Sequence, residues 1–361
     1  LKESMGQNTL VFNLDTALRM MGDVAEFYVD NEVRNHYFVS ISGYHIAEAG
    51  ANPISQAALT LSNGLTYVEL FNSRGLDANK FLRNFSWFFS NGMDPEYAVI
   101  GRVCRRIWAI AMRDMYGVDE RGQKLKYHIQ SSGRSLHAQE YTWNDYRTTL
   151  QALYALADNA NSLHTNSRDE AFGTPTEDTV RDAVAIQLIL SKEYGWLQNE
   201  NPLQGSHVAD WLTDSVEEEI LKIFEEMHRR GGVLGALEVN YQRNRIQDES
   251  MIYEHRKHSG ELPIIGVNTF EEGVDNSLSV EEFDIEVTRS DKEERMMVID
   301  RNKAFKETHA KEAEEGLARL KQVAREGGNL FEVMMDIVEY CTVGQVTQAL
   351  FETGGKFRRN M

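Results

Sequence analysis

Bulky apolar residues end abruptly at glycine and polar side chains in several places, and each such run predicts a short buried strand followed by a helix. Tyr37, Phe38, Val39 and Ile41 favour a strand, and Gly43 lets the chain turn. The same arrangement recurs in segments 126–133 and 162–170. Because the carboxyl ends of parallel strands share one edge of a sheet, the three segments predict a common rim where chemistry takes place.

Helical spacing of apolar residues fills the intervals between these strands. Asp94 and Pro95 predict the start of a helix that runs to Gly117. The sequence at 174–177 has the form of a capping box, and it predicts a second helix with an apolar face. That face consists of Val180, Ala183, Val184 and Leu188. Alternation of strand and helix predicts an α/β fold.

From Ser215 onward the strand signal fades and helical spacing dominates. We therefore predict two regions, residues 1–214 with the α/β pattern and residues 215–361 with mainly helices. The later elements that we expect are a helix containing Ile220, Ile223, Phe224 and Met227 and ended by 229–232, a helix over 240–258, a strand over 262–270, an acidic linker over 271–290, and helices over 292–325 and 331–351.

Composition narrows the classes of function. A net charge of −18 argues against nucleic-acid binding, which needs clusters of Lys and Arg. No apolar run has the length of a membrane span, and the N-terminus has no signal-peptide pattern. Cys104 and Cys341 are far apart in the sequence. This spacing predicts neither a disulfide framework nor a zinc site, and it favours a reducing cytoplasm.

The strand-end segments 40–51, 126–133 and 162–170 resemble those of the cobalamin-dependent acyl-CoA mutases, the family of methylmalonyl-CoA and isobutyryl-CoA mutases. The likeness covers nearly the whole chain and is weak only between about 270 and 329. The end, 349–361, resembles that of the fused isobutyryl-CoA mutases. The resemblance implies the later part of a (β/α)8 TIM barrel followed by a mainly helical C-terminal region.

The resemblance also implies other domains. The chain enters directly on family-like sequence, so we expect a preceding segment. It has neither the Asp-x-His-x-x-Gly motif of the family's cobalamin-binding domain nor a Gly-x-x-x-x-Gly-Lys-Ser/Thr phosphate loop. We therefore expect a cobalamin-binding domain and a GTPase chaperone domain as partners, fused or separate, and the family favours a homodimer.

Tyr44 and His45 are the catalytic candidates. In the family, the residue matching His45 donates a hydrogen bond to the thioester carbonyl of the substrate, and the one matching Tyr44 packs between substrate and cofactor. Such a donor stabilises charge that develops on the carbonyl oxygen. Outside the family context His45 could be a structural histidine. A metal site made of His45 and Glu48 is disfavoured because no second pair with plausible partners follows.

The resemblance assigns Gln130, Asn166 and Glu170 to the adenosyl group of adenosylcobalamin, and Glu48 faces the same cavity. Amide and carboxylate side chains suit a ligand rich in hydroxyl groups. The alternative is purely local, since Asn166 and Asp169 could simply end a strand and begin a helix.

Gln7 and Ser86 are the substrate candidates. Methylmalonyl-CoA mutases have an arginine at the position of Gln7, where it pairs with a free carboxylate, and glutamine is found in mutases of monocarboxylic acyl-CoA substrates. Ser86 matches a serine that contacts the CoA arm. The family's nearby arginine is replaced by Asn84, which puts the CoA contacts in doubt, and Arg83 is either a substitute or a solvated surface residue.

The resemblance implies an isomerase that rearranges isobutyryl-CoA to n-butyryl-CoA by radical chemistry with adenosylcobalamin. Methylmalonyl-CoA, isovaleryl-CoA and 2-hydroxyisobutyryl-CoA stay open as substrates. The alternative of another class is a non-catalytic module for assembly or dimerisation.

Overall fold

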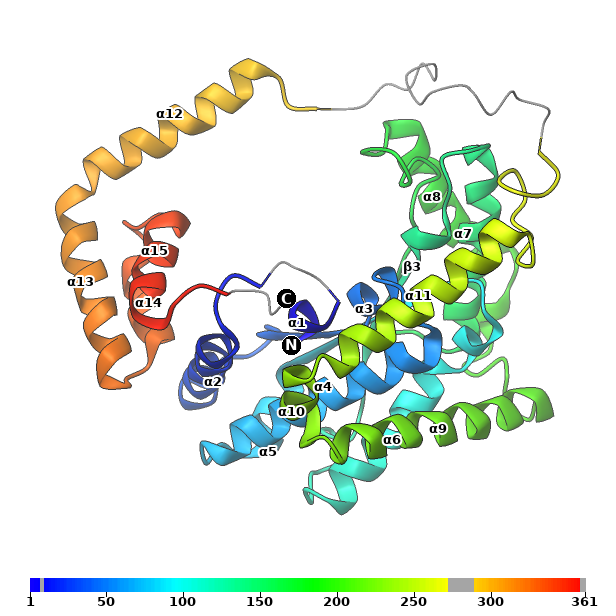
Figure 1. Ribbon diagram of the computed structural model, residues 1–361, viewed down its shortest axis with the longest axis horizontal. Helices are drawn as coiled ribbons and strands as arrows, with labels where there is room; N and C mark the ends of the chain where they lie inside the picture. Colours follow the sequence, from blue (N-terminus) through cyan, green and yellow to red (C-terminus); the bar gives the residue numbers. More distant parts are fainter. Residues whose placement is uncertain (7–9, 272–288, 358–361) are drawn as a thin grey trace.

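The computed structural model describes residues 1–6, 10–271 and 289–357, and within these residues the chain is mostly helical around one small sheet. The predicted α/β class is confirmed. Figure 1 shows the sheet in the middle of the larger part of the molecule, with α12 to α15 at the opposite end from α7 and α8. The strands are β1 (Val39–Ser42), β2 (Phe85–Asn91), β3 (Tyr127–Ser131) and β4 (Ser162–His164). The helices are α1 (Lys2–Met5), α2 (Leu14–Asp30), α3 (Tyr44–Glu48), α4 (Pro53–Ser73), α5 (Ala78–Phe81), α6 (Ile100–Asp114), α7 (Asn144–Ala157), α8 (Glu177–Leu188), α9 (His207–His228), α10 (Gly232–Glu238), α11 (Tyr241–Ser259), α12 (Lys292–Thr308), α13 (Ala310–Glu326), α14 (Leu330–Ile337) and α15 (Val343–Gly354).

The four strands are parallel and lie in the order β1-β2-β3-β4. Ile41 pairs with Trp87, and Trp87 in turn pairs with Tyr127, so the strands are aligned in one register. Strand β2 was not among the predicted strands. Because the strands are parallel, the segments that follow β1, β3 and β4 meet at one edge, as the sequence predicts.

The two faces of the sheet differ in chemistry. Alternate residues of the strands point into a core shared with helices α4, α6 and α7, and they include Ile41, Trp87, Phe89, Tyr127 and Ile129, each at most 2% exposed. The opposite face is half-exposed or exposed and carries small or polar side chains with one phenylalanine: Ser40, Ser86, Phe88, His128, Gln130 and His164. Helix α9 packs outside α4 and α6, so these helices form two layers on one face of the sheet.

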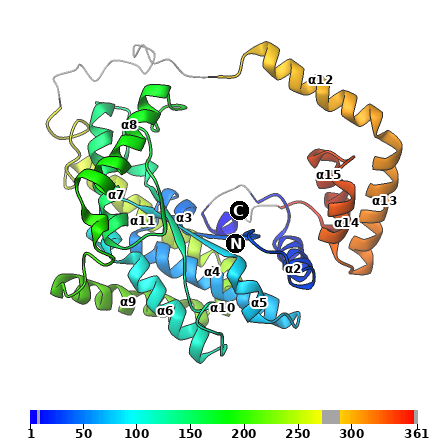
Figure 2. The ribbon, with the colours of Figure 1, turned by 180° about the vertical axis from the view of Figure 1, so that it is seen from behind.

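Helices α13 to α15 form a small second core around Leu320, Val333 and Ile337, and this core is seated on α2. Figure 2 shows the same arrangement from behind. Helix α12 precedes this bundle and buries none of its residues. Phe331 of α14 lies against Phe27 of α2 with ring centroids 5.2 Å apart, so residues about 300 positions apart in the sequence build one interface.

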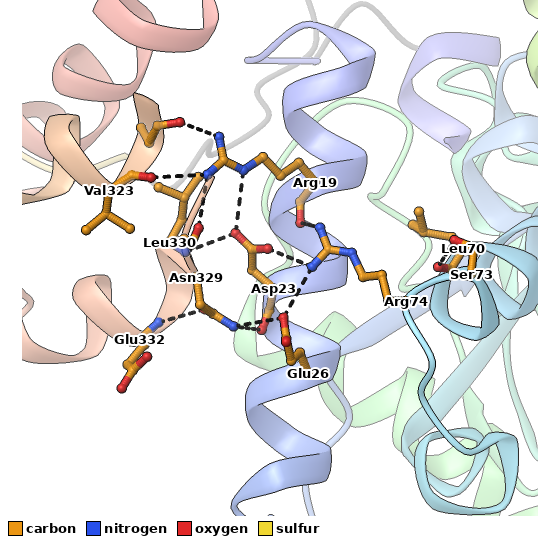
Figure 3. A network of polar contacts seen from close by, with 12 residues as sticks. Arg19, Asp23, Glu26, Leu70, Ser73, Arg74, Val323, Asn329, Leu330 and Glu332 are labelled. Carbon is orange, nitrogen blue, oxygen red and sulfur yellow. Dashed lines mark hydrogen bonds and ion pairs between the residues drawn. The ribbon is translucent and has the colours of Figure 1, made fainter. Parts of the chain in front are cut away.

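One turn of α2 caps both helix ends at the junction of α13 and α14 (Figure 3). Arg19 Nη1 donates to the carbonyl of Ala324 at 2.6 Å, near the end of α13. Asp23 Oδ2 accepts from the backbone N–H of Leu330 at 2.9 Å, at the start of α14. A cation at a helix C-terminus and a carboxylate at a helix N-terminus both complement the helix dipoles. Arg74, just after α4, donates to Asp23 Oδ1 at 2.7 Å and joins this cap to the larger core.

The predicted strand over 262–270 is wrong. The segment is a loop closed by Asn268, whose side chain accepts from the N–H of Ile264 at 2.7 Å and donates to the carbonyls of Lys257 and Leu262. Only an isolated bridge joins Ile265 to Thr269. An amide side chain therefore satisfies the backbone groups that a neighbouring strand would otherwise pair.

Several predicted helix boundaries are corrected. Pro95 begins a short 3-10 turn, and α6 starts only at Ile100. The N-cap of α8 is Thr176 with Thr179 as its partner, two residues later than predicted. Three members of the predicted α8 face are exposed, whereas Ala183 and Ile186 are buried. The exposed three are Val180, Val184 and Leu188.

The remaining helix predictions for the C-terminal region hold with modification. Helix α9 buries Ile220, Ile223 and Met227 and ends at His228 as expected. The predicted helix over 292–325 is interrupted at His309, and the one over 331–351 forms two helices. The predicted boundary between 214 and 215 falls inside α9 and stays a prediction. The acidic linker at 272–288 lies outside the described residues, and both cysteines are free and buried.

Candidate active site

The close approach of β1 to α4 and β2 places the catalytic candidates at the edge of the sheet. The N–H of Gly43 donates to the carbonyl of Phe88 at 2.7 Å. A Cβ atom at Gly43 would lie 2.3 Å from Thr60 Oγ1 and 2.8 Å from Gln56 Cγ, so only glycine fits there. Helix α3 begins at the next residue and carries Tyr44 and His45 in its first turn.

Ring stacking and a hydrogen bond fix the side chain of Tyr44. Its ring stacks on Phe88 with centroids 4.8 Å apart and planes 8° from parallel. Gln130 Nε2 donates to the Tyr44 hydroxyl at 3.1 Å. Burial raises the pKa of Tyr44, and the carboxylates of Glu48 and Glu170 raise it further. Tyr44 is therefore a neutral phenol with a fixed ring.

Gln130 and Asn166 are joined to the same array. Gln130 Nε2 donates to Asn166 Oδ1 at 2.9 Å. Asn166 is only 1% exposed, and its side chain donates to the carbonyl of Ser131 at 2.8 Å. The structure thus brings Tyr44, Gln130 and Asn166 together. The nearby Asp169 has a local role, because its carboxylate accepts from Ser167, Thr176 and Thr179 at the start of α8.

His45 stands beside Tyr44 with one ring nitrogen unpaired. Its ring meets the edges of Tyr44 and Phe88, with centroids 5.4 and 5.9 Å away. Within the described part of the chain, buried Nδ1 has no hydrogen-bond partner. Burial lowers the pKa of His45, the charge of Lys2 lowers it further, and Glu3 opposes this shift. The imidazole is therefore neutral near pH 7.

Glu48 accepts hydrogen bonds from the segments around the site. Its Oε1 accepts from the hydroxyls of Ser90 at 3.0 Å and Ser132 at 2.8 Å. Its Oε2 accepts from the backbone N–H of Arg134 at 2.8 Å. Burial raises the pKa of Glu48, while these hydrogen bonds oppose the shift. One carboxylate thus ties α3 to the ends of β2 and β3.

Gly133 lies beside the cofactor candidates Glu48, Glu170 and Asn166, and we call these four residues the cradle. A Cβ atom there would lie 3.4 Å from Glu48 Oε2, 3.7 Å from Glu170 Cγ and 3.8 Å from Asn166 Nδ2. Within the residues described, the Glu170 carboxylate accepts no hydrogen bond from the protein. Burial and the neighbouring carboxylates raise its pKa. The absence of a side chain at Gly133 therefore leaves a gap the size of one methyl group beside the carboxylate of Glu170 and the amide of Asn166.

The substrate candidates are only partly placed. Ser86 lies on the half-exposed face of β2, opposite Ser40 of β1. Arg83 is exposed and donates to the carbonyl of Asn79 at 3.2 Å, which fits the solvated alternative. Asn84 is 5% exposed. Gln7 lies outside the described residues.

Sequence reasoning missed Phe88, His128 and His164, which share the half-exposed face with Ser86. Phe88 touches Tyr44 and His45, and its ring is 5.3 Å from that of His128. His128 Nδ1 is hydrogen-bonded to the Ser162 hydroxyl at 2.8 Å. A signal was available for His128 and His164, because these polar residues alternate with apolar residues along their strands.

A cavity of about 720 Å³ has Ala47, Ser132, Arg134 and His137 among its lining residues. Arg134 closes one wall by stacking over the ring of Tyr253 of α11 at 4.3 Å. The described residues contain no group of His, Cys, Asp and Glu side chains that could hold a metal ion. Likewise, none of the helices described is long and apolar enough to cross a membrane.

Comparisons with known proteins agree with the resemblance read from the strand ends. Residues 1–356 match the family model described as methylmalonyl-CoA mutase. The chain is 60% identical over its whole length to the fused isobutyryl-CoA mutases of Nocardia farcinica and Geobacillus kaustophilus, and it spans 33% of each. It is 33% identical to the 2-hydroxyisobutanoyl-CoA mutase large subunit of Aquincola tertiaricarbonis, with 99% of this chain and 63% of that subunit covered. The chain belongs to the methylmalonyl-CoA mutase family.

Proposed function

We propose that this chain is part of an adenosylcobalamin-dependent acyl-CoA mutase that rearranges isobutyryl-CoA to n-butyryl-CoA. The observation that carries the proposal is the array of Tyr44, His45, Gln130 and Asn166 at one sheet edge, joined by the stack on Phe88 and two hydrogen bonds. The 60% identity to proteins named fused isobutyryl-CoA mutase supports the choice of substrate.

We propose that the adenosyl group binds at the cradle. Gly133 leaves space, Glu170 offers a free carboxylate, and Asn166 and Gln130 offer amides, which together suit the hydroxyl groups of a ribose. The sequence assigns Glu48 to the cofactor. Glu48 would act on the cofactor indirectly, by fixing the loop that contains Ser132 and Arg134. When bound, the cofactor supplies the radical chemistry that these side chains cannot perform.

His45 and Tyr44 would act on the substrate by position. The Nε2 of His45 is the ring nitrogen left for the thioester carbonyl oxygen, because Nδ1 is buried. A hydrogen bond there stabilises charge that develops on the oxygen as the thioester group moves. Tyr44, fixed against Phe88, forms a wall that excludes water and confines the reacting groups.

The sheet supports a substrate path along its half-exposed face. We propose that the strands are the later part of a (β/α)8 barrel and that this face is its interior. Strand order, parallel direction and helices on the other face all support this. Ser40 and Ser86 are small and polar, so the pantetheine arm of CoA could pass beside them.

The chain spans about a third of the length of its fused relatives. We therefore propose that a cobalamin-binding domain and a GTPase chaperone domain, fused or separate, complete the enzyme and that the enzyme is a homodimer. The incomplete set of strands in the described residues supports the need for further segments.

The test is turnover by the complete enzyme loaded with adenosylcobalamin, with isobutyryl-CoA, methylmalonyl-CoA and 2-hydroxyisobutyryl-CoA as separate substrates and mass analysis of the acyl products. We expect n-butyryl-CoA from isobutyryl-CoA and little product from the other two. His45→Gln should lower kcat about 100-fold or more, as expected when a donor to a developing oxyanion is lost. The exposed His207→Gln is the matched control.

Product from methylmalonyl-CoA alone would contradict the assignment of the substrate. Full turnover by His45→Gln would contradict the assignment of the site and favour the non-catalytic assembly role instead.

A further inference from the structure

Helix α1 lies directly over the backbone of His45. It packs against α3, and Met5 at its end is fully buried. A Cβ atom on Gly6, the next residue, would lie 3.5 Å from the carbonyl oxygen of His45 and 3.1 Å from Ala49 Cβ. The position of α1 is therefore fixed relative to the imidazole, and so are its charged side chains.

Lys2 is the cation that this packing brings to the site. Its Nζ donates to the hydroxyl of Ser42 at 3.1 Å, three residues before His45, and Ser42 is in turn 2.7 Å from the hydroxyl of Ser40. The Lys2 side chain is only 17% exposed. Water screens a charge in such a place poorly, so its field acts on the neighbouring ring.

The other charged groups around His45 are few. Glu3 lies 3.8 Å from Lys2 Nζ and partly offsets its charge. Strand β2, which packs against α3, has no titratable residue. The remaining titratable groups on the described elements packed here are the amino group of Leu1, 3.5 Å from Glu3 Oε2, Tyr44 and Glu48 of α3 itself, and Tyr67 and Glu69 late in α4.

The buried and unpaired Nδ1 of His45 makes the protonated ring less favourable than the neutral ring. An imidazolium carries an N–H on both ring nitrogens, and the one at Nδ1 would be buried without an acceptor. The neutral ring with its proton on Nε2 leaves only a lone pair at Nδ1. Repulsion from Lys2 acts in the same direction, because it opposes a second positive charge.

We propose that Lys2 is a positioning residue that keeps His45 neutral and protonated on Nε2. This inference rests on the proposed function, in which Nε2–H is the donor to the thioester carbonyl. Lys2 would then act through His45 and not through the substrate, and it would keep the donor present in one form as the surrounding pH changes.

The experiment is NMR spectroscopy of ¹⁵N-histidine in the complete enzyme, with the His45 signals assigned by their loss in His45→Gln. In the unaltered enzyme we expect a neutral ring with Nε2–H at pH 7 and above, because its pKa is lowered from the ordinary value. In Lys2→Met the ring should take up a proton at higher pH, and Lys2→Arg should restore the original behaviour. Lys80→Met, at an exposed lysine, is the control and should change nothing.

Kinetics give a second readout. The acid limb of the pH profile of kcat/KM should move to higher pH in Lys2→Met and return in Lys2→Arg. An Nδ1–H tautomer or an imidazolium in the unaltered enzyme, or an unchanged titration in folded Lys2→Met, would overturn the inference. Failure of the proposed function is distinguishable, because it appears as undiminished turnover in His45→Gln whatever the NMR result.

Discussion

The side-chain nitrogen of Gln130 lies 3.1 Å from the hydroxyl of Tyr44, and the same nitrogen lies 2.9 Å from Asn166 Oδ1. One amide at the end of β3 thus joins α3, which follows β1, to the segment that follows β4. A single side chain therefore sets the relative positions of residues that we assign to the substrate and to the cofactor.

Gln130→Met removes both hydrogen bonds at nearly constant volume. Asn166 Oδ1 is then buried without its donor, which costs about 1–3 kcal/mol. If this free-energy cost destabilises the arrangement of the site that reacts, kcat/KM drops about tenfold or more. Steady-state turnover in the complete enzyme measures it, and Gln322→Met on the exposed side of α13 is the control. Equal rates in both variants would show that the amide only fills space.

The sequence could reveal the strand ends, because β1 and the start of α3 are local features. Val39 and Ile41 favour a strand, and Gly43 marks the turn. Strand β2 escaped prediction because Trp87, Phe88 and Phe89 do not alternate in polarity. Phe88 faces the open side, where Tyr44 covers it, and no local pattern reports a partner 44 positions away.

The role of Glu48 and the structure of segment 262–270 depend on which other residues each of them contacts. Glu48 is polar and was assigned to the cofactor, yet its oxygens are taken by Ser90, Ser132 and the N–H of Arg134, which are 42 to 86 positions away. The apolar run 262–270 looked like a strand, but Asn268 pairs its backbone groups within a loop. Composition cannot distinguish a ligand-binding carboxylate from a structural one, or a strand from such a loop, because both outcomes depend on which polar groups are nearby.

Gly133→Ala tests the cradle. The new methyl group meets Glu48, Glu170 and Asn166 at ordinary contact distances, so we expect Tm to change by less than about 2 °C. The methyl group occupies the gap, and binding of adenosylcobalamin, followed by its absorption spectrum, should weaken at least about tenfold. Gly344→Ala, at an exposed position in the first turn of α15, is the control. Unchanged cofactor affinity would place the adenosyl group elsewhere.

Asp23→Ala tests the cap between α2 and the C-terminal helices (Figure 3). Asp23 is 3% exposed, and its loss takes away the acceptor of the Leu330 N–H and the buried carboxylate partner of Arg74, which keeps Glu26 and the carbonyl of Arg19. We expect the opening free energy of α13 and α14, measured by hydrogen exchange, to fall by about 3 kcal/mol. Asp336→Ala, which breaks an exposed pair with Arg319, should cost less than about 1 kcal/mol. Similar losses of free energy in both variants would show that the burial of Asp23 does not strengthen its contribution to the cap.

His137 gives a pH dependence whose sign follows from its burial. It lines the cavity of about 720 Å³ and is 8% exposed, and burial together with Arg147 and Lys257 lowers its pKa from 6.5 to about 4. The folded protein therefore keeps His137 neutral while the unfolded chain takes up a proton below pH 6.5. This contribution to stability is fully present above pH 6.5 and is lost as the pH falls toward 4.

His137→Gln removes the proton uptake, so its Tm should decline less between pH 6.5 and 5 than that of the unaltered enzyme. His207→Gln, at an exposed histidine, should keep the original steepness. Differential scanning calorimetry at several pH values compares the three proteins. Because only the slope with pH is compared, a constant loss of stability caused by the substitution itself does not affect the conclusion. Parallel slopes for all three would mean that His137 is protonated in the folded protein, and the cavity would then have to provide an acceptor for it.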